Sequence, residues 1–261
     1  MRVGAGQDAT EGEAARAPAR GLPAVFHVTH WKAGSTWLTR ILARCGGERF
    51  VKPRLEVAHF LREPIEPGRV YPRVYVTHEE FERVALPVAW RRFVVIRDLR
   101  DTLVSAYFSI RRTHPVGELP QLAEDRARLQ AMRPDQGLAW MLDHAMVAGS
   151  ARIQESWLEA GAPVVRYEDL LTDDVRILQR VLIDECEFPL ERPAVARIVE
   201  GTRFRTLSGG RDRGAEDLAS HFRKGVAGDW RNHFDPPLAR AFKERWGDLL
   251  IAGGYERDRD W

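Results

Sequence analysis

Short runs of apolar and β-branched residues recur along the chain, and longer segments with helical spacing of apolar positions lie between them. The runs cover residues 25–29, 73–77, 92–97 and 163–167. Runs of this length and composition are typical of buried β-strands. The run at 92–97 is continuously apolar between its flanking arginines, which favours a parallel sheet covered on both faces.

The segments between these runs predict helices and loops. Helices are expected from Ser35, from Leu99, over 136–160, from Asp169, over 174–184 and over 193–200. Residues 46–72, rich in proline and glycine, predict a connection, of which a part around 57–61 can be helical. Polar residues 111–135 predict a mobile excursion over the site, and glycine-rich 205–222 predict a flexible loop.

Strands that alternate with helices indicate an α/β fold, a single three-layer domain with a mostly parallel central sheet and helices on both faces. We expect this domain to span residues 21–261. Residues 1–20 are rich in Ala, Gly, Arg and Glu, and they predict a disordered tail.

Composition limits the possible partners. Of the 261 residues, 44% are hydrophobic, enough for a sizeable core, and the net charge is only +2. Such a balanced charge gives no argument for nucleic acid or a membrane surface as a partner. No apolar run approaches the roughly 20 residues of a membrane span. Two cysteines, Cys45 and Cys186, are too few for a disulfide framework or a zinc site. We therefore expect a reducing, cytoplasmic setting.

The turn after the first strand carries the clearest chemistry. Free backbone N–H groups at a helix start, together with the helix dipole, attract anions. Lys32 adds a full charge, Gly34 a tight turn, and Ser35 and Thr36 hydroxyl donors. The turn is not a Walker A motif, because its lysine precedes the glycine. It suits a phosphate or a sulfonate, and an ordinary capped helix start is the alternative.

This turn resembles the P-loop-like 5′-phosphosulfate loop of sulfotransferases that use 3′-phosphoadenosine 5′-phosphosulfate (PAPS). The matching residues are Lys32, Ala33, Gly34, Ser35, Thr36 and Trp37. The family usually has proline before the lysine and serine after it, where this chain has Trp31 and Ala33. The backbone cradle survives both changes, and one hydroxyl is lost.

Further motifs follow in the order of the same family. Arg97 and Ser105 match its 3′-phosphate motif, although a strand-end arginine paired with a nearby aspartate is the alternative reading. The resemblance implies that the remaining matches contact the adenosine and the 3′-phosphate. These are Tyr167, Thr202 and Phe204 near the adenosine, and Arg223, Lys224 and Gly225 around the 3′-phosphate. Phe204 reads equally well as a core residue.

His78 is the candidate general base. It follows the second apolar run, and ligands of open α/β sheets bind at the carboxyl ends of strands. The Thr77–His78 pair also resembles the catalytic pair of the family, and His30 beside the loop is a rival. Val76 stands where cytosolic members often carry lysine, so that positive charge is missing or comes from elsewhere.

The resemblance implies transfer of a sulfuryl group from PAPS to a hydroxyl or amine of a small-molecule acceptor, leaving adenosine 3′,5′-bisphosphate (PAP). His78 and Lys32 are the expected catalytic residues, and no metal is required. The alternatives are a P-loop-type kinase or NTPase and a non-catalytic nucleotide-binding protein. Residues 235–237, Asp-Pro-Pro, depart from the dimer signature of animal cytosolic members, so the oligomeric state stays open. Residues 249–255 resemble the close of many bacterial relatives.

Overall fold

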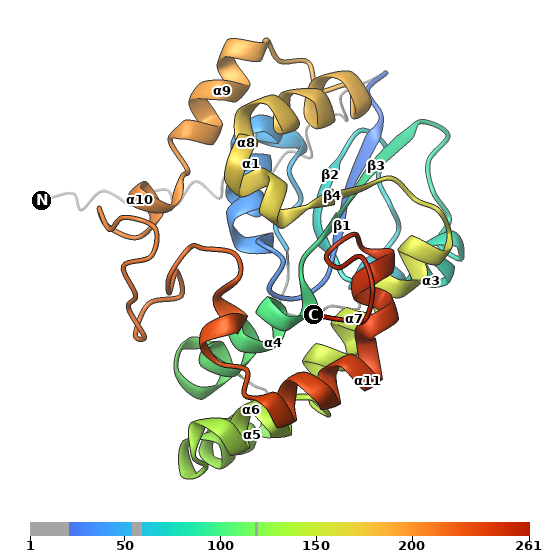
Figure 1. Ribbon diagram of the computed structural model, residues 1–261. Helices are drawn as coiled ribbons and strands as arrows, with labels where there is room; N and C mark the ends of the chain where they lie inside the picture. Colours follow the sequence, from blue (N-terminus) through green and yellow to red (C-terminus); the bar gives the residue numbers. More distant parts are fainter. Residues whose placement is uncertain (1–20, 54–58, 118–119) are drawn as a thin grey trace, which may run out of the picture.

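A computed structural model describes residues 21–53, 59–117 and 120–261. Its sheet is wholly parallel, with the strand order β2-β1-β3-β4 (Figure 1). The strands are β1 (Ala24–Thr29), β2 (Val70–Val74), β3 (Trp90–Ile96) and β4 (Val164–Arg166). This arrangement confirms the predicted α/β domain with a parallel sheet.

Alternate residues of the two central strands feed two different cores. Val25, Phe93 and Val95 pack on one face of the sheet, whereas Phe26 and Val94 pack on the other. Every residue of β1 is buried. A strand covered on both faces reads as a continuous apolar run, which is the pattern in the sequence. The predicted layers of helices on both faces are therefore confirmed.

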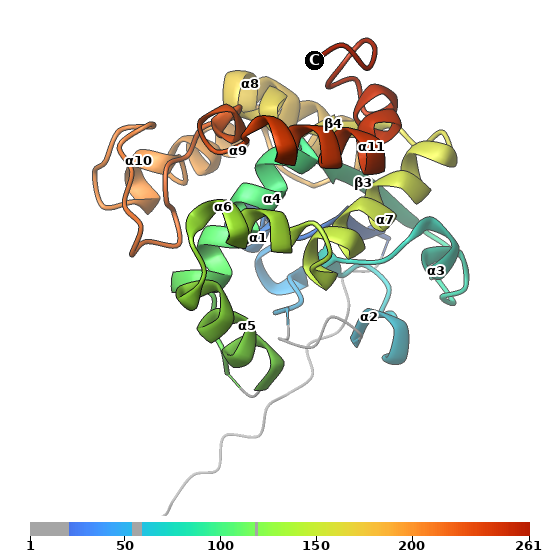
Figure 2. The same ribbon diagram turned by 60° about the horizontal axis from the view of Figure 1, so that its bottom comes forward.

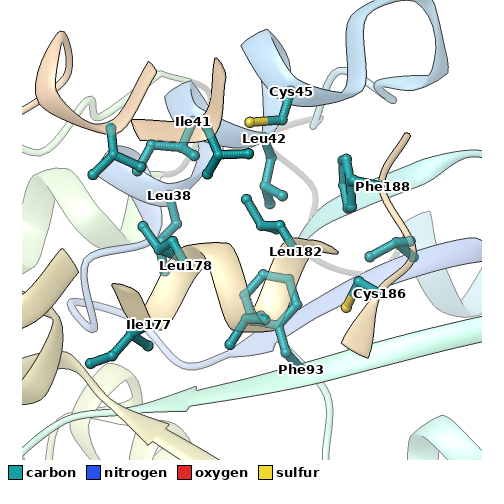
Figure 3. Packing of buried hydrophobic residues seen from close by; sticks show 14 of the residues in the cluster. Leu38, Ile41, Leu42, Cys45, Phe93, Ile177, Leu178, Leu182, Cys186 and Phe188 are labelled. Atoms are coloured by element: carbon teal, nitrogen blue, oxygen red, sulfur yellow. The ribbon is translucent and has the colours of Figure 1, made fainter. Parts of the chain in front are cut away.

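Helices from both halves of the chain cover the first face. They are α1 (Ser35–Gly46), α8 (Tyr167–Gln179), the following π-helical turn η3 (Arg180–Glu185) and α9 (Arg192–Glu200). Their leucine, isoleucine and valine side chains interdigitate above Phe93, as Figure 3 shows. Cys45 and Cys186 lie unpaired in this cluster, and burial raises the pKa of each thiol to about 12.

The opposite face is covered by α3 (His78–Glu82) and α7 (Ala145–Glu159), whose Phe81 and Trp157 pack on Phe26 and its neighbours. A further group of helices lies beyond the carboxyl ends of the central strands (Figure 2). It contains α4 (Leu99–Phe108), η2 (Ser109–Thr113), α5 (Pro120–Ala131), α6 (Pro134–Met141) and α11 (Pro236–Ala252). The remaining short elements are η1 (Gly47–Arg49), α2 (His59–Arg62), α10 (Phe204–Leu207) and η4 (Asp229–Asn232).

Several element boundaries differ from the prediction. The second strand ends at Val74, not residue 77, because Thr77 forms a capping box with Glu80 and starts α3 there. The predicted helix over 136–160 is two helices, since His144 adopts an extended backbone and caps α7 by accepting from the Met146 amide. The predicted helices from Asp169 and over 174–184 correspond to α8 with η3, and non-helical backbone at Asp173, with a φ of −142° and a ψ of 58°, separates the two as predicted.

Residues 111–135, predicted to form a mobile excursion over the site, are mostly helical in their described part. The sequence of α5 is polar, and few of its side chains, among them Leu122 and Leu129, reach the core. Arg126 clamps the preceding turn by donating to the carbonyl oxygens of Ile110 and His114. Tertiary contacts of this kind are invisible to hydrophobic periodicity.

The predictions for the N-terminal tail and for part of the connection at 46–72 fall on residues that the structure does not describe. Residues 1–20 lie outside the described residues, as do 54–58 within the predicted connection. Residues 205–222 include part of α10 and a series of turns, where Arg211 donates to the carbonyl oxygens of Ala215, Phe222 and Arg223. Within the described residues, no helix is both long and apolar enough to cross a bilayer.

Candidate active site

The turn between β1 and α1 has the strained backbone of a tight anion cradle. Lys32 has a φ of 68° and Gly34 a φ of 78°, both in the left-handed region that favours glycine. A Cβ on Gly34 would come within 2.6 Å of the Tyr167 ring, so the turn needs glycine twice over. Ser35 is the first residue of α1 and not its predicted cap; Gly34 takes the cap position. The Ser35 hydroxyl instead accepts from the Tyr75 hydroxyl at 2.9 Å.

Lys32 lies in a strongly cationic setting. Desolvation, followed by the charges of Arg97, Arg223 and Arg73, lowers the pKa of its ammonium group to about 8. Its carbonyl oxygen accepts from Arg97 Nη1 at 2.8 Å, which ties the turn to the end of β3. So many like charges in one place destabilise the free protein and favour a bound anion.

Arg97 is held from several directions. Its guanidinium lies 4.7 Å from the centroid of the Tyr167 ring and 3.7 Å from the carboxylate of Asp101. Asp101 also accepts from the backbone amides of Gly228 and Trp230, at 2.6 and 2.9 Å. Arg97 therefore does form the ion pair at the strand end that the alternative reading expected. The same aspartate also binds the backbone at residues 228 and 230 and so holds that segment beside the arginine.

The block at 223–225 is organised by Asp229. Its carboxylate pairs with Arg223 and Lys224 and accepts from His233 and Asn232. Burial alone would raise the pKa of this carboxylate, but the hydrogen bonds together lower it. Gly225 has a φ of 68°, and a Cβ there would come within 2.4 Å of the Phe204 ring. Glycine therefore lets the backbone approach an aromatic ring beside two cations.

These elements enclose one cavity of about 810 Å³. Most residues predicted to bind the donor line it: Lys32, Gly34, Ser35, Thr36, Trp37, Arg97, Ser105, Tyr167, Phe204, Arg223, Lys224 and Gly225. Segments that are nearly two hundred residues apart in the chain thus line the same cavity. Within the described residues, no group of His, Cys, Asp or Glu has the arrangement of a metal site.

Two predicted donor contacts do not line the cavity. Ala33 is fully buried in the turn, so only its backbone can serve a ligand. Thr202 is also fully buried, and its hydroxyl donates to the carbonyl oxygens of Ile198 and Val199 at the end of α9. Of the predicted adenosine contacts Thr202 and Phe204, only Phe204 lines the cavity.

The described lining of the cavity does not include His78. Because β2 ends at Val74, the predicted strand-end position of His78 is wrong. The residue begins α3 instead, its ring packs edge-on against Trp157, and its Nε2 lies 3.7 Å from the carboxylate of Glu82. The hydrogen bond, ion pair and ring contact described for His78 join it to Ser156, Glu82 and Trp157, none of which belongs to the turn between β1 and α1.

The rival His30 is fully buried and already engaged. Its Nδ1 lies 3.0 Å from the Trp31 carbonyl oxygen, and its Nε2 lies within 3.2 Å of the Arg97 amide and the Gln154 side chain. Burial lowers its pKa to about 4. His30 is therefore a structural link between β1, β3 and α7.

Sequence reasoning missed several lining residues. Arg73 has a φ of 57° where the register of β2 against β1 shifts, and it donates to Thr39 and Thr36 at 2.9 and 3.4 Å. It supplies a positive charge that Val76 does not. The signal was Pro72, since proline within a strand marks an edge or a bulge. The remaining lining residues include Trp31, Arg40, Tyr75, His114, Leu122, Ala145, Met146 and His221.

A parallel α/β domain with a tight turn and a helix N-terminus after its first strand is typical of proteins that bind phosphate-like groups. Within that class, the family model described as "Sulfotransferase domain" matches residues 22–252, and the chain belongs to the sulfotransferase family. It is therefore a sulfotransferase, as the motifs predicted.

Individual relatives agree with this placement. A 3-alpha-hydroxysteroid sulfotransferase of Cavia porcellus is 25% identical over 87% of this chain and 83% of its own length. Cytosolic sulfotransferase 11 of Arabidopsis thaliana is 26% identical over 82% of this chain and 68% of its own length. The solved structure of mouse sulfotransferase SULT7A1 in complex with PAP shares the fold, with a TM-score of 0.58 and 21% identity over 87% of this chain and 84% of that chain.

Proposed function

We propose that this enzyme transfers the sulfuryl group of PAPS to a hydroxyl or amine of a small-molecule acceptor. The observation that carries the proposal is the convergence of Lys32, Arg97, Arg223 and Lys224 on the lining of one cavity. PAPS carries a phosphosulfate and a separate 3′-phosphate, and cations from three separate segments suit two separate anionic groups.

The cavity fits such a nucleotide in other respects. Arg97 Nε and Trp37 Nε1 are buried, and neither has a partner among the described residues, so both can donate to a ligand. The rings of Trp37, Tyr167 and Phe204 line the same space, and aromatic rings can stack on a base. Gly34 and Gly225 bring backbone close to the cavity.

When bound, PAPS supplies the activated sulfuryl group and a phosphate leaving group. Lys32, the turn amides and the hydroxyls of Ser35 and Thr36 stabilise the negative charge that develops there. Arg97, Ser105, Arg223, Lys224 and Gly225 hold the 3′-phosphate and fix the orientation of the nucleotide. A histidine takes the proton of the acceptor.

Ligand-induced stabilisation tests the choice of donor. PAP should raise the melting temperature far more than AMP or Mg-ATP, because only PAP offers the 3′-phosphate. A ligand at about 100 times its dissociation constant contributes roughly 2.7 kcal/mol of stability. Equal or greater stabilisation by Mg-ATP would favour the kinase reading.

A variant sharpens this test. Arg223→Ala should weaken PAP binding by about 10–100-fold, the equivalent of roughly 1.5–3 kcal/mol for a charged hydrogen bond. It should leave the affinity for AMP, which lacks the 3′-phosphate, nearly unchanged. Equal weakening of both nucleotides would contradict the 3′-phosphate assignment.

Mass spectrometry of products identifies the reaction itself. Incubation with PAPS and a panel of phenols, alcohols and amines should add one sulfuryl group to at least one acceptor. PAP binding without transfer to any acceptor, water included, would support the non-catalytic alternative. We place the enzyme in the cytoplasm, in keeping with its two buried free thiols.

A further inference from the structure

His78, the predicted general base, is not part of the described cavity lining, whereas two other histidines are. Of the histidine side chains that the structure describes, His114 and His221 line the cavity. Desolvation, followed by the charge of Lys32, lowers the pKa of each ring, and His114 also contributes to the lowered pKa of His221. Both therefore lie near the turn that is proposed to hold the phosphosulfate.

We propose that His114 is the general base of this sulfotransferase, an inference that rests on the proposed function. His114 follows η2 and lines the cavity together with Pro115 of the same segment, Leu122 of α5 and Met146 at the start of α7. We call these apolar neighbours the apolar wall; Trp31 and Ala145 complete it. An acceptor with an apolar skeleton would lie against this wall, with its nucleophile between His114 and Lys32.

Hydrogen bonding separates His114 from His221. Nε2 of His221 lies 3.1 Å from Thr36 Oγ1, and Arg73 donates to the same hydroxyl. Thr36 can then donate its proton to His221, which occupies the lone pair of that ring and ties it to the donor turn. For His114, only Nδ1 has a described partner, Ser109 Oγ at 3.4 Å. With the Nδ1 proton donated to Ser109, the Nε2 lone pair is free to accept.

The backbone of His114 is held firmly. Its amide donates to the Ser109 carbonyl oxygen at 2.7 Å, and its own carbonyl oxygen accepts from Arg126 of α5. Desolvation, Lys32 and Arg126 lower the pKa of the ring to about 4, so the imidazole is neutral at neutral pH and able to take a proton. Sulfonate and phosphate charges near Lys32 would offset this repulsion and favour the protonated ring during the reaction.

The step balances without a further reactant. The acceptor O–H or N–H proton moves to Nε2 of His114 as the acceptor atom forms its bond to sulfur. The bond from sulfur to the bridging phosphate oxygen breaks, and its electron pair stays on that oxygen in the product PAP. His114 then returns the proton to water.

His114→Ala tests the proposal against His78→Ala, with an aliphatic alcohol and 4-nitrophenol as acceptors and PAP affinity measured by calorimetry. His114→Ala should lower turnover with the alcohol by about 10²–10⁴-fold. At a pH above the pKa of 4-nitrophenol, where this acceptor is already ionised, its turnover should fall far less, and PAP affinity should stay within about threefold. Added imidazole should restore part of the lost activity, which it would not do for a purely structural residue.

A chemical readout on the free protein accompanies these rates. Diethyl pyrocarbonate reacts with accessible lone pairs of neutral imidazoles, and mass spectrometry should find His114 modified well before buried His30. Near-normal turnover in His114→Ala, equal losses with both acceptors, or an unreactive His114 would overturn the proposal; a matching loss in His78→Ala would return the base to α3.

Slow hydrolysis of PAPS, in which water serves as the acceptor, distinguishes failure of the proposed function from failure of the role given to His114. It should be measurable in the wild type and should fall in His114→Ala. A wild type that neither hydrolyses PAPS nor sulfates an acceptor contradicts the proposed function itself. An active wild type with an unaffected variant contradicts only the role of His114.

Discussion

The cationic lining of the cavity and its apolar wall are built in different ways. Cations and turn residues come in short local motifs, such as residues 32–37 and 223–225, whose internal spacing already places backbone and charge together. The apolar wall takes single side chains from the donor turn, the segment after η2, α5 and α7. A motif can be found in a sequence, whereas a wall made of isolated residues can be found only in a fold.

The two regions should also respond differently to mutation. Changes in the cationic lining should affect donor binding and turnover for every acceptor. Changes in the apolar wall should affect one acceptor more than another and spare the donor.

Loss of the turn lysine should have the largest effect. Lys32→Ala should lower turnover by about 10²–10³-fold, the usual consequence of removing one preorganised donor from developing charge. PAP affinity should fall as well, since Lys32 lies among the donor-binding cations. Steady-state rates and calorimetry check both. A variant that lost only acceptor affinity would move Lys32 to the acceptor region.

A methyl group at Gly225 should come next. It would strain a backbone with φ of 68° and collide with Phe204, so PAP binding should weaken by about 10–100-fold. Gly209 is a matched control, because its φ is 76° but nothing lies within 4 Å of a Cβ there. Calorimetry on Gly225→Ala and Gly209→Ala separates the contact from the backbone strain. Equal losses in both would show that Phe204 is not what requires the glycine.

The apolar wall should give a smaller and more selective effect. Met146→Ala should raise the KM of a bulky apolar acceptor by roughly tenfold, in line with the 1.5–3 kcal/mol of a fully buried side chain, and leave PAP affinity unchanged. Met132→Ala, outside the cavity lining, is the matched control. Weaker PAP binding in Met146→Ala would mean that the wall also serves the donor.

The pH dependence of donor binding should be the smallest effect. The Lys32 pKa of about 8 is depressed from the ordinary value of 10.5, so the free protein loses this charge as the pH rises through 8. A bound anion raises that pKa, so PAP affinity should fall above pH 8, by about fourfold between pH 7 and 8.5. Calorimetry in Lys32→Met, which has no such ionisation, should show a flatter profile. An unchanged slope in that variant would assign the ionisation elsewhere.

The histidines show where local patterns stop being informative. Thr77 and His78 match a catalytic pair in sequence. In the structure, however, Thr77 forms a capping box with Glu80, and the two residues begin helix α3. The residues that reach the cavity from that segment are Arg73 and Tyr75. A register shift between β1 and β2 decides which side chains face the site, and no run of residues announces such a shift.

By itself, the sequence determined the parallel α/β domain and the sulfotransferase family, and it predicted most of the residues that form the cationic lining of the cavity. These rest on apolar runs and on motifs whose chemistry is complete within a few consecutive residues. Only the tertiary structure decided that Arg73 supplies charge, that His78 lies outside the lining and that His114 and His221 lie within it. The reason is physical: hydrophobic burial and local turns are written in neighbouring residues, whereas the side chains that meet across a cavity depend on register, helix breaks and packing between distant segments.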